Sequence, residues 1–400
     1  MESLKELYVI GPGPSSSHTI GPYKACIDFI KDINDLKITE IEVILKGSLA
    51  LTGKGHFTDK IILKTLKDYN TIIKFDYSLK NLKHPNTLVI KGLNNKELII
   101  ESTYYSVGGG KILKNSLSNE CNEIYPLNKL DEIKTYLKMN NLKDIKDFVN
   151  NFEDKDIDEY LNNIVNKMIE SVQTGLNKEG KLPGLNLDRV AKKLYEKSKT
   201  LNEPERIGML LTSFAYAVSE NNSSGEMIVT APTCGSAGIV PSIIYYEEKM
   251  NNVSRNKIID SLKVGGIFGN LAKKSASISG AMSGCQAEIG VASAMGAAIL
   301  AYLNDLNLYQ IEYASEVALE HFLGLTCDPV KGYVQIPCIE RNGIGVLRSY
   351  NSYLYAKNIA PLRKNMVSYD AVIETMKITG NDLSSLYKET SEGGLAKIIK

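Results

Sequence analysis

The pattern of hydrophobic and polar positions changes along the chain. Between residues 38 and 100, short apolar or alternating runs such as I-T-E-I-E-V-I-L-K and N-T-L-V-I-K-G are separated by turn residues, which predicts β-strands. A helix is expected before these strands, at residues 22–32, and S-V-G-G-G closes the last strand. These elements predict a small N-terminal α+β unit.

Beyond residue 157 the apolar positions recur at helical spacing, as in D-E-Y-L-N-N-I-V-N-K-M-I. Small residues dominate residues 258–303 and allow helices to approach closely. The apolar stretch Ile289–Leu303 has fifteen residues, fewer than the roughly 20 that span a bilayer, so we expect a buried helix and no membrane association.

The predicted fold class is a multidomain α+β protein, in which a small α/β-sandwich-like domain precedes a mostly helical domain. The expected boundaries are residues 1–125 for the N-terminal domain, 126–156 for a connection and 157–400 for the helical domain.

Composition narrows the functional classes. Apolar residues make up 43% and charged residues 23% of the chain, as in ordinary folded proteins. The 47 basic residues are balanced by 46 acidic ones, which argues against nucleic-acid binding and favours a small-molecule substrate. Six cysteines without a secretion signal indicate a reducing cytoplasm, where thiols serve metals or redox chemistry.

Three cysteines in the last third of the chain are candidate metal ligands. Cys285, Cys327 and Cys338 lie in G-C-Q-A-E-I-G, L-T-C-D-P-V and Q-I-P-C-I-E-R-N, with 41 and 10 residues between them, unlike the compact runs of ferredoxins. Pro329 lies two residues after Cys327, and Pro337 lies directly before Cys338. These prolines place both cysteines where helices begin or end. Three thiolates can hold a four-iron cluster with one iron open as a Lewis acid, whereas three buried structural thiols are the alternative.

Two glycine-bracketed loops near the N-terminus carry histidines. In G-P-G-P-S-S-S-H-T-I-G, three serines precede His18 at the start of a helix, which is typical of a carboxylate or phosphate site, although capping explains one serine. In G-S-L-A-L-T-G-K-G-H, Gly55 stands where a P-loop requires Ser or Thr, so His56 does not belong to a nucleotide site. Imidazole suits proton transfer near neutral pH, and a structural role is the alternative for either histidine.

Two further loops can let a ligand approach the backbone closely. These are S-V-G-G-G at residues 106–110 and A-P-T-C-G-S-A-G at residues 231–238. Cys234 in the second loop stays unassigned, because it could line a pocket, take no part, or compete as a fourth ligand.

Together these motifs, with T-Y-Y-S-V-G-G-G and E-T-S-E-G-G-L-A, resemble the iron–sulfur-dependent L-serine dehydratases (L-serine ammonia-lyases) in their fused single-chain form. The resemblance covers nearly the whole chain. It implies a β domain similar to an allosteric substrate-binding domain, then a catalytic α domain with a [4Fe–4S] cluster on the three cysteines. It also implies L-serine as substrate, pyruvate and ammonium as products, and a homodimer.

The resemblance also implies roles for the loop residues. His56 is the preferred base, and the choice between His56 and His18 stays open. The expected substrate-binding residues are Ser15, Ser16, Ser17, Thr19, Gly108, Gly109, Gly110, Thr233, Gly235 and Ser236. Some fused members end in a cysteine that fills the open iron site, whereas this chain ends in L-A-K-I-I-K. Control of the open iron by a terminal cysteine is therefore not expected here.

Three rival hypotheses remain at this point. A cysteine-desulfurising lyase would use the same chemistry on a thiol leaving group. A pyridoxal-phosphate enzyme needs a Schiff-base lysine, for which Lys54 in G-K-G-H has the most inviting context. A metal-stapled, amino-acid-sensing protein would require four zinc ligands, and therefore Cys234 in addition to the three cysteines.

Overall fold

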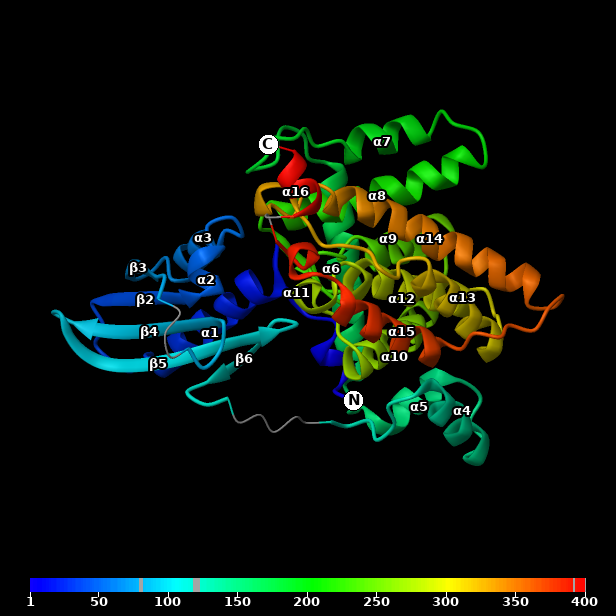
Figure 1. Ribbon diagram of the computed structural model, residues 1–400, viewed down its shortest axis with the longest axis horizontal. Coiled ribbons are helices and arrows are strands. Elements are labelled where there is room, and N and C mark those ends of the chain that lie inside the picture. Colours follow the sequence, from blue (N-terminus) through cyan, green and yellow to red (C-terminus); the bar gives the residue numbers. More distant parts are fainter. Residues whose placement is uncertain (79–81, 118–122, 391–392, 400) are drawn as a thin grey trace. The chain divides into compact units, whose positions relative to one another are not determined.

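The computed structural model describes residues 1–78, 82–117, 123–390 and 393–399. The chain forms two compact units: the smaller comprises Gly11–Cys121 and Ser224–Met227, and the larger comprises Met1–Ile10, Asn122–Ser223 and Ile228–Lys400. Strands β1 (Ile10–Pro12) and β7 (Met227–Val229) each begin in one unit and end in the other. The predicted class, an α/β part followed by a mostly helical part, is confirmed (Figure 1).

A five-stranded sheet organises the small unit, in the order β3-β2-β4-β5-β6. Strand β2 runs parallel to β3, and the other neighbouring strands are antiparallel. The elements of this unit after β1 are, in chain order, η2 (Ser16–Ile20), α1 (Gly21–Asp32), β2 (Glu40–Gly47), α2 (Ser48–Leu51), α3 (Thr58–Thr65), β3 (Asn70–Asp76), β4 (Asn86–Asn94), β5 (Glu97–Gly108) and β6 (Lys111–Lys114).

The alternation that predicted β2 gives the sheet one apolar face. Ile41, Val43 and Leu45 are fully buried and alternate with half-buried residues, because successive side chains of a strand point to opposite faces. Phe29 of α1 and Ile62 of α3 belong to the same apolar core. Helices therefore cover this face, and the small unit is a two-layer α/β sandwich.

Helices make up most of the larger unit. In chain order they are η1 (Leu4–Glu6), α4 (Leu130–Met139), α5 (Ile145–Phe152), α6 (Ile157–Leu176), α7 (Ala191–Ser198), α8 (Glu205–Ser223), α9 (Ile239–Tyr245), η3 (Tyr246–Met250), α10 (Arg255–Ser275), α11 (Gly280–Ser283), η4 (Gln286–Gly290), α12 (Val291–Leu303), α13 (Leu308–Glu320), η5 (Val330–Gly332), α14 (Cys338–Ile359), α15 (Tyr369–Asp382), η6 (Ser385–Tyr387) and α16 (Gly394–Ile398).

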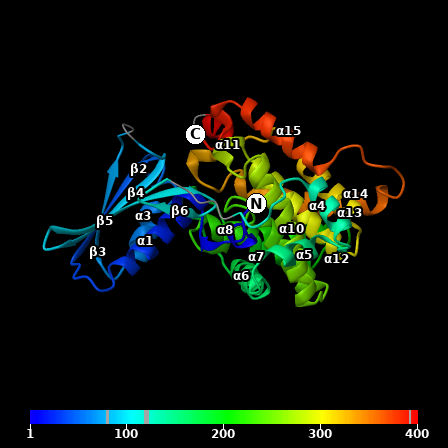
Figure 2. The ribbon, with the colours of Figure 1, turned by 90° about the horizontal axis from the view of Figure 1, so that it is seen from below.

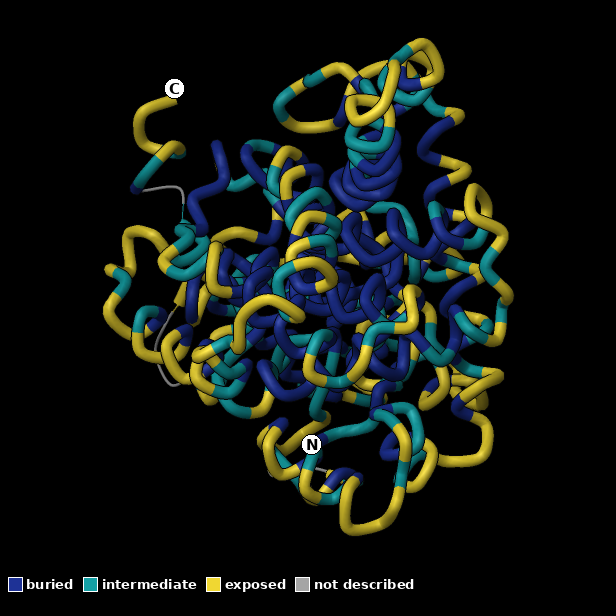
Figure 3. Tube along the Cα trace, turned by 90° about the vertical axis from the view of Figure 1, so that its right-hand side faces the viewer, coloured by how far each residue is buried: buried dark blue, intermediate teal, exposed yellow. Residues whose placement is uncertain are grey.

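Helix α12 forms the centre of the helical unit and packs against α9, α10, α13 and α14 (Figures 1 and 2). Small residues permit this packing, since a Cβ on Gly296 would lie 2.6 Å from both Ile243 Cδ1 and Ser349 Oγ. Figure 3 shows buried segments concentrated in the interior of this unit. Among the described residues, Gln286–Leu303 alone has the length and hydropathy to cross a membrane, and 89% of it is buried inside the protein, as in a core helix.

The first ten residues of the chain, which were expected in the N-terminal domain, pack in the helical unit. Tyr8 Oη donates a hydrogen bond to the Leu262 carbonyl at 3.0 Å. Leu4 lies against Gly266, where a Cβ would come within 2.7 Å of its side chain. The polypeptide therefore starts in the helical unit before it enters the sheet.

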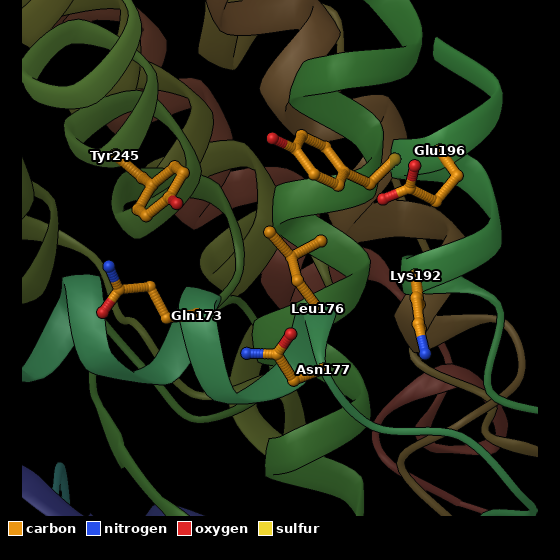
Figure 4. A pocket seen from close by; sticks show the side chains of 7 residues that line it. Gln173, Leu176, Asn177, Lys192, Glu196 and Tyr245 are labelled. Carbon is orange, nitrogen blue, oxygen red and sulfur yellow. The ribbon is translucent and has the colours of Figure 1, made fainter. Parts of the chain in front are cut away.

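A pocket with a volume of about 390 Å³ lies in the helical unit between α6, α7 and α9 (Figure 4). Its lining includes Gln173, Lys192, Glu196 and Tyr245. None of the residues predicted from the motifs lines it.

Candidate active site

Three thiols gather in the helical unit. Cys285 directly precedes η4, Cys327 lies in the loop after α13, and Cys338 is the first residue of α14. The Sγ atoms of Cys285 and Cys327 and a carboxylate oxygen of Glu288 lie within 4.8 Å of one another. Cys338 is close enough to Cys285 for their charges to interact, and the three cysteines are only 3%, 4% and 8% exposed. Segments distant in the sequence thus form one buried group of donors, which we call the thiol cluster.

Two glycines pack closely against the thiol cluster. A Cβ on Gly280, the first residue of α11, would lie 2.8 Å from Glu288 Oε2 and 3.2 Å from Cys327 Sγ. A Cβ on Gly235 would lie 2.8 Å from Glu288 Oε1. Any larger residue would have to displace a donor, so glycine at both positions lets the backbone approach the donors closely.

A cationic side chain adjoins the sulfurs. The guanidinium of Arg341 donates to the Thr326 carbonyl at 2.6 Å and to Asp328 Oδ1 at 3.3 Å, and its charge interacts with Cys285 and Cys338. The thiolate is the form of cysteine that binds metals, and a nearby cation offsets part of the negative charge of such a site.

Burial opposes charge on the donors. Burial and the neighbouring Cys285 raise the pKa of the Cys338 thiol well above its ordinary range, and a hydrogen bond with Cys285, together with burial, does the same to the pKa of Cys327. Burial also raises the pKa of Glu288 to about 7. Such groups become charged together only when a bound cation compensates them, since ligands release their protons as a metal binds.

The A-P-T-C-G-S-A-G loop lies against the thiol cluster. Thr233 Oγ1 donates to Glu288 Oε1 at 2.6 Å and lies 3.2 Å from Ser236 Oγ, which donates to the Ala231 carbonyl at 3.3 Å. Cys234 in this loop is 1% exposed. The loop thus orients the carboxylate that shares the site with the sulfurs.

Asn342 was not singled out from the sequence, yet it joins this loop to a metal-ligand candidate. Its Nδ2 donates to the Gly235 carbonyl at 2.8 Å and to the Cys338 carbonyl at 2.9 Å, and its Oδ1 accepts from the Gly238 N–H at 2.9 Å. The signal available in the sequence was its position, four residues after Cys338, which places both on one face of a helix.

The donor set fits a metal centre. Thiolate-rich sites select zinc or iron–sulfur clusters over harder ions such as magnesium. The burial of the three cysteines and the proximity of Cys285, Cys327 and Glu288 meet this requirement. The thiol cluster is therefore a cysteine-rich site that can bind a metal.

Two histidines stack in the small unit. The ring centroids of His18 and His56 are 4.5 Å apart, with 27° between the ring planes. Nε2 of His18 lies 3.1 Å from Ser48 Oγ and 2.8 Å from Thr52 Oγ1, and its Nδ1 lies 2.9 Å from Ser17 Oγ. We call these five residues the histidine–hydroxyl cluster.

The hydrogen bond of His56 determines which of its nitrogens can accept a proton. Nδ1 donates to the Thr52 carbonyl at 3.1 Å, so the neutral ring carries its lone pair on Nε2. Burial lowers the pKa of His56, and burial together with the charge of His56 lowers the pKa of His18. Both rings are therefore neutral near pH 7, as a general base must be.

The predicted hydroxyl and glycine loops adjoin this cluster. Ser15 Oγ accepts from the His18 N–H at 3.3 Å as the cap of η2, which begins at Ser16, and Thr19 Oγ1 donates to the Pro12 carbonyl at 2.7 Å. Ser106 Oγ donates to the Ser17 carbonyl at 2.8 Å and so ties the end of β5 to the serine turn. The loop that follows has the left-handed φ angles 104°, 59° and 77° at Gly108, Gly109 and Gly110.

The predicted site residues thus fall into two groups, each within one unit. The histidines, the hydroxyls of residues 15–19 and the glycine loop belong to the small unit, whereas the three cysteines, Thr233, Gly235 and Ser236 belong to the helical unit. Cys26 is a core residue of the small unit, Cys121 lies outside the described residues, and His321 is a 45% exposed side chain at the end of α13.

Comparison with known proteins identifies the family. The family model for the serine dehydratase beta chain matches residues 3–72, and that for the alpha chain matches residues 86–396. An L-serine dehydratase of Helicobacter pylori is 39% identical over 100% of this chain and 99% of its own length.

Two further relatives extend this likeness to other bacteria. An L-serine dehydratase of Haemophilus influenzae is 37% identical over 100% of both chains, and L-serine dehydratase 1 of Escherichia coli is 36% identical over 99% of both. The chain belongs to the serine dehydratase family, with the beta-chain and alpha-chain parts fused in one polypeptide.

Proposed function

We propose that the chain is an L-serine ammonia-lyase, which removes water from L-serine and yields pyruvate and ammonium. The observation that carries this proposal is the match, over essentially the whole length, to enzymes named L-serine dehydratase. The histidine–hydroxyl cluster and the thiol cluster support it, because this elimination needs a base for the α-proton and assistance for a poor leaving group.

We propose that Cys285, Cys327 and Cys338 hold a [4Fe–4S] cluster. With three protein ligands, such a cluster supplies an open iron that acts as a Lewis acid on the departing hydroxyl. Arg341, whose charge interacts with Cys285 and Cys338, would balance negative charge at the site.

His56 is the proposed base. Its Nδ1–H is occupied by the Thr52 carbonyl, so the α-proton would be taken at Nε2. His18 contacts three hydroxyl groups instead and is better placed to orient polar groups of the substrate. Loss of the α-proton and of the β-hydroxyl forms the C=C bond of an enamine, whose imine tautomer water hydrolyses to pyruvate and ammonium.

The polar loops are the proposed substrate-binding elements. In the small unit, hydroxyls and N–H groups of the serine turn and the glycine loop would hold the carboxylate and amino groups of L-serine. In the helical unit, the Thr233 hydroxyl and its neighbours orient Glu288 beside the thiols. The residues concerned are Ser15, Ser16, Ser17, Thr19, Gly108, Gly109, Gly110, Thr233, Gly235 and Ser236.

We also propose that the enzyme works in the cytoplasm, as a homodimer. The six cysteines support a reducing compartment. Light scattering on anaerobically purified protein tests the dimer, and a mass near 44.1 kDa would contradict it.

Quantification of iron and acid-labile sulfide in protein purified without oxygen, together with pyruvate formation from L-serine, tests the main proposal. Iron and sulfide in equal amounts with rapid pyruvate formation are expected. Protein without sulfide would contradict the proposed cluster. Protein that contains iron and sulfide but forms no pyruvate would contradict the proposed activity.

A further inference from the structure

One threonine of the histidine–hydroxyl cluster contacts both imidazoles. Thr52 Oγ1 lies 2.8 Å from His18 Nε2, and the Thr52 carbonyl accepts from His56 Nδ1 at 3.1 Å. Thr52 directly follows the short helix α2, and its hydroxyl donates to the Ser48 carbonyl at 2.9 Å. This is the bond that a threonine commonly makes with the carbonyl four residues earlier. Thr52 thus joins the two rings that stack on each other.

The main chain of His18 is held by other residues. Its carbonyl accepts from Thr58 Oγ1 at 2.7 Å, and its N–H donates to Ser15 Oγ at 3.3 Å. These bonds fix where the residue lies, but they do not determine which ring nitrogen carries the proton. The tautomer depends instead on the groups that the two ring nitrogens meet.

The single proton of the Thr52 hydroxyl decides the tautomer of His18. A hydroxyl can donate only one hydrogen bond, and the Ser48 carbonyl accepts it. Thr52 Oγ1 therefore meets His18 Nε2 as an acceptor, so Nε2 carries the ring proton. The neutral ring then keeps its lone pair on Nδ1, which accepts from Ser17 Oγ at 2.9 Å. The hydrogen bonds run in one direction, from Ser17 through His18 and Thr52 to the Ser48 carbonyl.

We propose that Thr52 is a positioning residue, whose hydroxyl fixes His18 in the Nε2–H tautomer and whose carbonyl fixes His56 in the Nδ1–H tautomer. The two rings consequently carry their protons on different nitrogens. His56 presents the lone pair of Nε2, whereas His18 directs the lone pair of Nδ1 to Ser17. This inference rests on the proposed function, in which His56 takes the α-proton and His18 orients polar groups of the substrate.

The same hydrogen bonds determine what Ser17 can offer a ligand. Because His18 Nδ1 accepts the hydroxyl proton of Ser17, Ser17 Oγ can only accept further hydrogen bonds. An acceptor suits the ammonium group of L-serine and not its carboxylate, which requires donors. Thr52 therefore also determines which end of the substrate Ser17 binds.

Nitrogen-15 NMR of the histidine rings tests the tautomers in the full-length chain without metal. The protonated and unprotonated ring nitrogens have well separated chemical shifts, and the chain has only four histidines. At pH 8 the wild type should show the Nε2–H tautomer for His18 and the Nδ1–H tautomer for His56. In Thr52→Val, Ser48 Oγ remains 3.1 Å from His18 Nε2 and can donate or accept, so His18 should become a mixture of tautomers. His56 should not change, because valine keeps the backbone carbonyl.

Two further variants separate the hydroxyl of Thr52 from its shape. Thr52→Ser keeps the hydroxyl and should show the wild-type tautomers. Thr65→Val is the matched control, because Thr65 Oγ1 makes the same kind of bond, to the Ile61 carbonyl at 2.7 Å within α3. Its His18 signals should match those of the wild type. Thr52 is exposed, so Thr52→Val should fold, and Thr52→Ala takes its place if it does not.

Kinetics of the enzyme with its full iron and sulfide content provide a second readout. Thr52→Val should raise KM for L-serine about tenfold, because Ser17 no longer presents a defined acceptor to the charged ammonium group. The value of kcat should stay near that of the wild type, because the tautomer of His56 is unchanged.

The inference is overturned if His18 has the Nδ1–H tautomer in the wild type, or if Thr52→Val leaves the His18 tautomer as it was. It is also overturned if Thr52→Val lowers kcat and leaves KM at the wild-type value. A wild-type protein that forms no pyruvate from L-serine would instead contradict the proposed function, and the NMR spectra would still decide whether Thr52 fixes the two tautomers.

Discussion

His18 and His56 stack with their ring centroids 4.5 Å apart in the small unit. A proton on one ring disfavours a proton on the other, and this repulsion adds to burial in lowering the pKa of His18. Of the two, His56 has its Nδ1–H engaged by a carbonyl, which directs proton uptake to Nε2. The geometry therefore favours two neutral rings and gives His56 a defined tautomer.

Replacement of His56 by Asn should lower kcat by about 10²- to 10⁴-fold, the usual contribution of a general base. The Asn amide can still donate toward the Thr52 carbonyl, so the change removes mainly the proton acceptor. Pyruvate formation is measured at equal iron and sulfide content. The control is His321→Asn, which alters a 45% exposed side chain and should keep the wild-type turnover. Near-normal turnover of His56→Asn with its full iron and sulfide content would exclude His56 as the base.

The free energy of unfolding of the small unit should fall as the pH falls below about 6.5, the ordinary pKa of histidine. Burial lowers the pKa of both His18 and His56 in the folded protein, so the unfolded chain binds protons first. Stability is therefore lost from pH 6.5 down to the folded pKa values, and is unaffected above this range.

Urea unfolding of the small unit, followed by tyrosine fluorescence between pH 8 and pH 5, measures this effect. A double His18→Asn, His56→Asn variant should show a weaker dependence on pH over the same range. An identical dependence in the variant would mean that these two histidines do not cause it.

Substitution of Gly280 by Ala should remove most of the bound iron. The added Cβ would lie 2.8 Å from Glu288 Oε2 and 3.2 Å from Cys327 Sγ, so a donor must move. Gly208→Ala is the matched control, because the nearest atom to its Cβ is 3.9 Å away and Ala favours a helix. Iron per chain after anaerobic reconstitution is the measurement, and equal loading of both variants would refute the crowding argument.

Asn342→Ala should lower the free energy of unfolding of the helical unit and loosen Cys338. The change removes three hydrogen bonds to backbone groups and leaves the buried Gly238 N–H without this partner, at a cost of about 1–3 kcal/mol. The control is Asn358→Ala, an exposed residue of the same helix whose amide donates to the Leu354 carbonyl. Thermal unfolding of both metal-free variants provides the comparison, and equal midpoints would show that Asn342 is not a structural link.

Much of the fold followed from local patterns. The alternation at Ile41, Val43 and Leu45 predicted a strand with one buried face, and the sheet has that face, because the period of two is a property of the strand itself. The assignment of the first ten residues to the helical unit had no local signal, since it depends on contacts such as Tyr8 with Leu262.

Glu288 and Asn342 show the same limit at the candidate site. The approach of Glu288 to two sulfurs depends on how η4 meets the Cys327 loop. The partners of Asn342 became visible only in the structure. Capping and hydrogen bonding between distant segments leave no periodic trace in a sequence.

By itself, the sequence determined the two kinds of secondary structure, the three cysteines in their motifs and the two glycine-bracketed histidines, because residue type and short-range spacing carry that information. Only the tertiary structure decided that the thiols share a buried space with a carboxylate, that the imidazoles stack, and that Thr52 contacts both of them. These relationships arise when helices and loops pack, and packing brings together residues that the chain keeps far apart.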